Sequence, residues 1–174
     1  MKTRSPLSTL SRLGPLAALS LVGLCAAEPT AATGPAAVPE TPVMKSQVFN
    51  WEKLAVKTTP NGQRRDVLDG RTATLIQLEC HVTSLLPGRA AHLPHRHPWE
   101  EIIVVKEGTL EVNLNGELSR VGPGSVLFYA PKDLHGVRNV GDTLASYHVL
   151  IWKSRDTQPG RSVSEPAPTV TPKG

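Results

Sequence analysis

The chain has 174 residues, and 19 Lys and Arg residues against 15 Asp and Glu residues give it a formal net charge of +4. Residues 1–27 contain three of the basic residues, Lys2, Arg4 and Arg12, and no acidic residue. Residues 28–174 therefore contain 16 basic and 15 acidic residues and carry a net charge of +1. Those residues are scattered among one another, whereas a nucleic-acid-binding protein needs a continuous basic surface. Composition therefore argues against nucleic acid as a partner.

Residues 1–27 are predicted to be a secretory signal peptide. Their basic start is followed by the apolar stretch 13–24 and by small residues that end at Ala27. This stretch is about half of the ~20 residues that a membrane span needs, so we expect cleavage before Glu28 and no membrane span. The sequence thus predicts an exported protein, periplasmic or secreted.

The two cysteines bear on the same question. In the alternative interpretation Cys25 is the lipidated first residue of a bacterial lipoprotein, but Leu24 occupies a position where such signals usually carry a small residue. Cleavage after Ala27 leaves Cys80 alone, so no disulfide within the chain is expected. Cys80 lies in an apolar pattern and is interpreted as a small buried hydrophobic residue.

Two segments are predicted to be disordered because they are rich in Pro, Ala and Thr and poor in large apolar residues. They are a linker at residues 28–46 and a tail at residues 154–174. Residues 47–153 lie between them, which is enough chain for one compact domain and too little for two.

This domain is predicted to be all-β. Short runs with strand composition alternate with Gly, Pro and Asn turns, and no stretch shows a helical period. The clearest local feature is Asn115-Gly116, a pair typical of two-residue hairpin turns, between two alternating runs. The runs are residues 47–51, 72–86, 102–106, 109–113, 117–121, 125–130 and 143–153.

Four polar side chains in this pattern suggest a metal site. His95 and His97 are two residues apart, so an extended chain presents both imidazoles to the same side. Pro98 interrupts the strand and lets Glu101 approach the same point from the next strand. His135 follows a turn at residues 131–133 and is the candidate for a fourth ligand.

The spacing of these residues resembles the motifs of the cupin superfamily. The first motif, G-x5-H-x-H-x3/4-E-x6-G, is matched by Gly88, His95, His97, Glu101 and Gly108, with six residues instead of five after Gly88. The second, G-x5-P-x-G-x2-H-x3-N, is matched more loosely by Gly124, Pro131, His135 and Asn139, with Asp133 replacing the middle glycine and two spacings shifted by one. The resemblance implies a small antiparallel jelly-roll β-barrel, a homodimer, and His95, His97, Glu101 and His135 as metal ligands that point into the barrel.

Three neutral imidazoles and one carboxylate suit a divalent ion such as Mn²⁺, Fe²⁺, Co²⁺, Ni²⁺ or Zn²⁺. An octahedral ion held by four protein ligands keeps two positions for a small polar molecule, which permits oxygenase, isomerase or lyase chemistry. A tetrahedral zinc site would be closed and structural. The alternative function is a non-catalytic module that binds a sugar or a carboxylate, with a structural metal or none.

Residues around the four ligands are open to more than one interpretation. Glu100 is an alternative ligand to Glu101, and Glu100 and Glu79 are candidate acceptors for the second N–H of the ligand histidines. His81 shares strand parity with Glu79 and faces either the pocket or solvent. His92 is expected at the rim of the site, and His148 is expected to be a hydrogen-bonded histidine of the sheet.

Three larger side chains flank the ligands. Trp99 either covers the metal or caps the core. Arg96 and Arg138 either receive an anionic substrate or point outward, because each is adjacent to an inward-facing position.

Overall fold

The computed structural model describes residues 42–166. The predicted signal peptide, Cys25 and most of the predicted linker lie outside the described residues, as does the end of the tail. Within the described part, no helix is long and apolar enough to cross a membrane.

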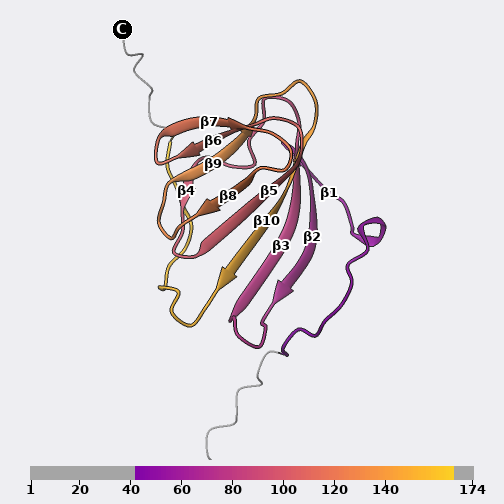
Figure 1. Cartoon of the computed structure of the whole chain (residues 1–174), viewed down its shortest axis with the longest axis vertical. Coiled ribbons are helices and arrows are strands. Elements are labelled where there is room, and N and C mark those ends of the chain that lie inside the picture. The colour runs from indigo at the N-terminus through magenta and orange to yellow at the C-terminus, as the bar shows by residue number, and fades with distance from the viewer. Residues whose placement is uncertain (1–41, 167–174) are drawn as a thin grey trace, which may run out of the picture. The chain divides into compact units, whose positions relative to one another are not determined.

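Within residues 42–166, eleven strands form two antiparallel sheets (Figure 1). The six-stranded sheet has the order β1 (Lys57–Thr59), β2 (Gly62–Gly70), β3 (Gln77–Leu85), β10 (Ala145–Lys153), β5 (Glu100–Glu107) and β8 (Val126–Tyr129). The five-stranded sheet has the order β11 (Val163–Ser164), β4 (His95–Arg96), β9 (His135–Asn139), β6 (Leu110–Leu114) and β7 (Glu117–Val121). The prediction of an all-β jelly-roll fold is confirmed.

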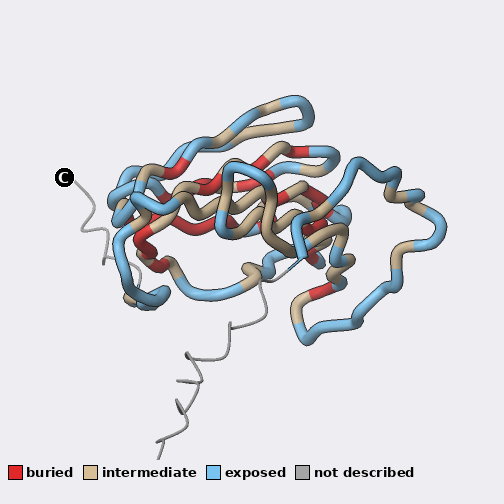
Figure 2. The backbone as a smooth tube through the Cα atoms, turned by 90° about the horizontal axis from the view of Figure 1, so that it is seen from below, coloured by how far each residue is buried: buried red, intermediate tan, exposed pale blue. Residues whose placement is uncertain are grey.

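The hydrophobic core lies between the two sheets, because alternate residues of each strand point inward. Leu85, Ile103 and Tyr147 come from the six-stranded sheet and contact Leu110 and Val112 of the other. The buried segments accordingly run along the inner strands, while connecting loops are exposed (Figure 2). Each sheet thus has one apolar face, as the alternating sequence pattern predicts.

The β6–β7 hairpin forms as predicted. Asn115 and Gly116 both have positive φ, 53° and 94°, and connect the paired residues Leu114 and Glu117. A residue with a Cβ resists this conformation, with Asn the usual exception, so an Asn-Gly pair favours the two-residue turn.

Two parts of the strand prediction are wrong. Residues 47–51 form no strand and lead instead into a short 3-10 helix, η1 (Trp51–Lys53), whose N-cap is Asn50. The run predicted from residue 72 begins as a strand only at Gln77, because residues 72–75 form a turn in which the Thr72 hydroxyl accepts a hydrogen bond from the Leu75 amide. Strands β1 and β2 were not predicted. Most residues of β2 are polar, so its sequence lacks the apolar alternation that indicates a strand.

The tail is ordered further than predicted. Strand β11 pairs with β4, and the Glu165 amide donates a hydrogen bond to the Pro94 carbonyl at 2.8 Å. The Glu165 carboxylate also accepts from Arg96 Nε at 2.7 Å. The prediction of disorder from residue 154 is therefore wrong up to residue 166, because contacts with β4 supply the order that this composition lacks by itself.

Candidate metal centre

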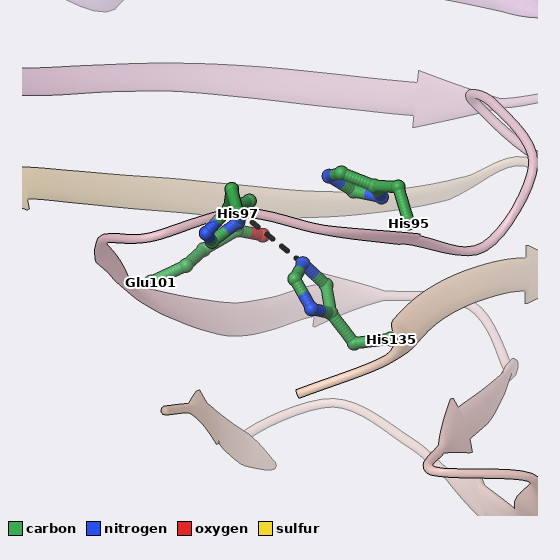
Figure 3. Close-up of side chains that lie close together, drawn as sticks. All are labelled: His95, His97, Glu101 and His135. Atoms are coloured by element: carbon green, nitrogen blue, oxygen red, sulfur yellow. Dashed lines mark hydrogen bonds and ion pairs between the residues drawn. The ribbon is translucent and has the colours of Figure 1, made fainter. Parts of the chain in front are cut away.

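The structure brings the four predicted ligand side chains together (Figure 3). His95 lies on β4 and His97 directly after it, Glu101 lies on β5, and His135 begins β9. One ligand atom from each residue can be chosen so that all four lie within 4.8 Å of one another, and all four residues are buried. Pro98 and Trp99 connect β4 to β5, which turns the chain so that Glu101 faces the two histidines before it.

Backbone carbonyls fix the orientation of two imidazoles. His97 Nδ1 donates to the Trp99 carbonyl at 2.9 Å, and His135 Nδ1 donates to the Asp133 carbonyl at 2.9 Å. A carbonyl can only accept, so each Nδ1 carries the proton and each Nε2 presents its lone pair to the cluster. The candidate acceptors Glu79 and Glu100 do not have this role.

The cluster contains polar atoms that the protein leaves without partners. His95 Nδ1 and His135 Nε2 are buried and form no hydrogen bond with the described residues. Glu101 Oε2 lies 3.1 Å from His97 Nε2 and 3.9 Å from His135 Nε2. Leaving a buried polar group unpaired costs about 1–3 kcal/mol, and a cation among these atoms would offset that cost. The donor set therefore fits a divalent metal ion.

Burial also keeps the histidines in the form that binds metals. It lowers the pKa of His95 to about 3, and the nearby histidines His92, His135 and His97 add to this effect. Burial likewise lowers the pKa of His135. Both imidazoles are therefore neutral at neutral pH, as metal ligation requires.

The metal-free protein is expected to lose stability as the pH falls below the ordinary pKa of histidine. His95 binds a proton in the unfolded chain below about pH 6.5 but stays neutral in the folded chain down to about pH 3, so folding opposes protonation over this range. Each such histidine lowers the free energy of unfolding by about 1.4 kcal/mol per pH unit. Urea unfolding in a chelator at about pH 7 and about pH 5.5 measures the loss.

The control for this experiment is His95→Asn, for which the difference between the two pH values should shrink by about 1.4 kcal/mol. An unchanged or higher stability of the wild-type protein at the lower pH would contradict the expectation.

A cavity of about 350 Å³ adjoins the cluster between the two sheets. All four candidate ligands line it, together with apolar side chains of β5 and β10 such as Ile103 and Val149. Its far wall is polar and comes from β2 and β3, which supply Arg64, Glu79 and His81. His81 and Glu79 thus face the cavity and not solvent, which resolves the alternative left open by the sequence.

Two aromatic side chains, Trp99 and His92, flank the ligand cluster. The Trp99 ring stacks on His97 with centroids 4.6 Å apart, and Lys153 Nζ lies 4.2 Å from the centroid of that ring, so Trp99 covers one side of the cluster. His92 is exposed and meets His95 edge to face at 4.2 Å between centroids, which is the predicted rim position.

The two arginines do not reach the cavity. Arg96 is engaged by Glu165, and the Arg138 side chain is 57% exposed. His148 lies on β10 between the inward-facing Tyr147 and Val149, so its ring points to the other face of the sheet.

Tyr129 is a further residue of the site, and the sequence did not predict it. The Tyr129 ring on β8 stacks on His135 with centroids 4.2 Å apart, and its buried hydroxyl has no hydrogen-bond partner among the described residues. Burial raises the pKa of Tyr129, so the hydroxyl stays protonated. Its position near the end of an apolar run was the available sequence signal, and the structure shows that it pairs with Glu101 across β5 and β8.

The fold and the cluster together define a class, that of double-sheet β-barrel proteins with a metal-ligand set inside the barrel. Residues 81–152 match the family model described as a cupin domain, and this match and the shared fold of solved cupin structures support the cupin superfamily for this part of the chain. No curated protein sequence matches the chain.

Solved structures share this fold. An RmlC-like cupin from Shewanella frigidimarina is 20% identical, with a TM-score of 0.52 over 64% of this chain and 95% of that one. KdgF from a Halomonas species is 24% identical, with a TM-score of 0.55 over 64% and 97% of the respective chains. The polyketide cyclase RemF from Streptomyces resistomycificus is 22% identical, with a TM-score of 0.54 over 70% and 87%. At these identities the likeness concerns the fold alone.

Proposed function

We propose that the domain holds one divalent metal ion through His95, His97, Glu101 and His135 and binds a small polar molecule in the adjoining cavity. The observation that carries the proposal is a buried set of four potential ligand residues, two of which have an imidazole nitrogen without a hydrogen-bond partner among the described residues, beside a cavity of about 350 Å³. A cavity lined by the ligand residues gives a small molecule room beside the metal, which a purely structural site does not require.

The protein's own residues would prepare the molecule for reaction. The carbonyls of Trp99 and Asp133 hold two imidazoles in the tautomer that directs Nε2 to the cluster. Trp99, stacked on His97, excludes water from one side, and the apolar wall formed by Ile103 and Val149 lowers the local dielectric constant. A metal bound here would act as a Lewis acid toward an oxygen of the molecule.

As an enzyme, the protein would be an oxygenase, an isomerase or a lyase. The polyketide cyclase is one structural neighbour with an activity in its printed name, and a sugar phosphate isomerase from Silicibacter pomeroyi is another. The second candidate function is a non-catalytic module that captures a sugar or a carboxylate. The polar far wall of the cavity favours a hydroxylated or charged ligand in either case.

Relaxation of water protons by Mn²⁺-loaded protein tests whether the metal is open to ligands. We expect Mn²⁺ in the wild-type site to enhance relaxation, and we expect oxalate or galacturonate to reduce this enhancement by displacing water from the metal. Full Mn²⁺ binding without enhanced relaxation of water protons would indicate a closed structural site and contradict the proposal.

We further propose that the protein is exported and forms a homodimer. The basic and apolar pattern of residues 1–27 supports export, and the cupin resemblance supports pairing. Mass spectrometry of the protein from the periplasm or medium should find Glu28 as its first residue, and light scattering should give twice the mass of one chain. Retention of residues 1–27, or a monomer mass, would overturn the respective statement.

A further inference from the structure

A second polar cluster lines the cavity on the side away from the candidate metal ligands. It consists of His81 and Glu79 on β3 and Arg64 on the neighbouring strand β2. His81 is only 8% exposed, so a histidine is held in the interior at a position where an apolar residue would complete the core. The proposed metal site does not use it.

Hydrogen bonds fix the tautomer of His81. Its Nδ1 lies 3.0 Å from Glu79 Oε1, and a carboxylate can only accept, so Nδ1 carries the proton. Nε2 is then the nitrogen that carries the lone pair and can accept a proton. An imidazole whose other nitrogen is held by a carboxylate is the arrangement of a general base.

Arg64 holds the carboxylate in turn. Its Nη2 donates to the same Glu79 oxygen at 2.8 Å, and its Nε donates to Asp66 at 2.6 Å. Asp66 also pairs with Lys57. Glu79 is therefore fixed from two sides, and the imidazole that it orients cannot rotate without breaking a charged hydrogen bond.

The register of the sheet sets the distance between this cluster and the proposed metal site. Ile151 on β10 pairs with Glu79 on one side and with Glu101 on the other, and the three residues form one row across the sheet. Two strand spacings separate Glu79 from Glu101, roughly 10 Å between backbones. Their side chains both enter the cavity, so a molecule of a few heavy atoms fits between them.

We propose that His81 is the general base of this cavity, removing a proton from a small carbonyl compound whose oxygens face the metal ligands. The inference rests on the proposed metal site. In the step, a C–H bond next to the carbonyl breaks, the proton forms an N–H bond at His81 Nε2, and the electron pair stays in the carbonyl π system. No oxidant or reductant is required. Glu79 and Arg64 are positioning residues.

Other groups in the cavity are less suited to this role. The hydroxyls of Tyr129 and Tyr147 are protonated because burial raises the pKa of both. His92 is exposed and is held by a backbone carbonyl, that of Leu93, without a carboxylate partner. Burial lowers the pKa of His81, which leaves it neutral and able to accept a proton at neutral pH.

Exchange of the methyl protons of pyruvate for solvent deuterium tests the proposal. Pyruvate offers two oxygens to a metal and an acidic C–H, and NMR follows the loss of its methyl signal with Zn²⁺-loaded protein. We expect the wild-type protein to accelerate exchange and His81→Gln to slow it about 100-fold or more. His148→Gln, which changes a histidine on the other face of the sheet, should exchange at the wild-type rate. Equal exchange by the wild-type protein and His81→Gln, both containing zinc, would overturn the proposal.

Two further measurements separate the possible failures. Zinc content of each sample reports the proposed function: wild-type protein without metal would overturn that function and this inference together. Nitrogen-15 NMR reports the tautomer of His81, which should be Nδ1–H in the wild-type protein. In Glu79→Leu the Nδ1–H group of His81 loses its acceptor, so the single tautomer should be lost and exchange should slow. An Nε2–H tautomer in the wild-type protein would contradict the role of His81 even if His81→Gln failed to fold.

Discussion

Metal at a free concentration 100 times its Kd is expected to raise the free energy of unfolding of the wild-type protein by about 2.7 kcal/mol. Only the folded chain brings the four ligand atoms within 4.8 Å of one another, so the metal binds the folded state in preference to the unfolded one. Urea unfolding with Zn²⁺ or Mn²⁺, compared with unfolding in a chelator, measures the difference.

Glu101→Gln should abolish this stabilisation at the same metal concentration. The substitution preserves the shape of the side chain but removes the negative charge that lies among three imidazoles. Glu100→Gln is the matched control, because Glu100 is the adjacent residue on β5, outside the cluster. Equal stabilisation of the two variants would show that the metal binds elsewhere.

Asn139→Ala is expected to destabilise the protein by about 3 kcal/mol, because three backbone groups lose their hydrogen bonds to a buried side chain. Asn139 is 0% exposed; its Nδ2 donates to the carbonyls of Leu85 and Thr143 at 2.9 and 2.7 Å, and its Oδ1 accepts from the Gly141 amide at 2.9 Å. This side chain thus ties the end of β9 to the end of β3.

Chemical unfolding of the metal-free protein measures this effect without interference from the metal site. Asn50→Ala is the control: this exposed residue caps η1 through one hydrogen bond to Glu52, and its loss should cost about 1 kcal/mol or less. A change of similar size in both variants would contradict the structural role assigned to Asn139.

The parts of the fold that the sequence predicted are those in which local chemistry and burial agree. The hairpin at Asn115-Gly116 follows from φ preferences, and β5 and β10 follow from apolar runs. The ligand cluster was predictable because His95 and His97 share one side of an extended segment, and the motif spacing added Glu101 and His135.

The parts that the sequence did not predict depend on tertiary context. Strand β2 presents Arg64 to a polar cavity, so its inward face lacks the apolar period by which strands are recognised. Strand β11 is two residues long and is ordered by β4 and by the pair between Arg96 and Glu165, contacts that composition does not encode. The side of the sheet on which His81 lies could likewise not be predicted without the register of β3.

Elemental analysis by mass spectrometry tests the central claim most directly. The mature protein, purified without a metal-chelating tag, is compared with the double variant His95→Ala/Glu101→Ala. The account predicts close to one equivalent of manganese, iron, nickel or zinc per chain in the wild-type protein and loss of that metal in the variant. Wild-type protein that contains no such metal and takes none up when these ions are added would contradict the account.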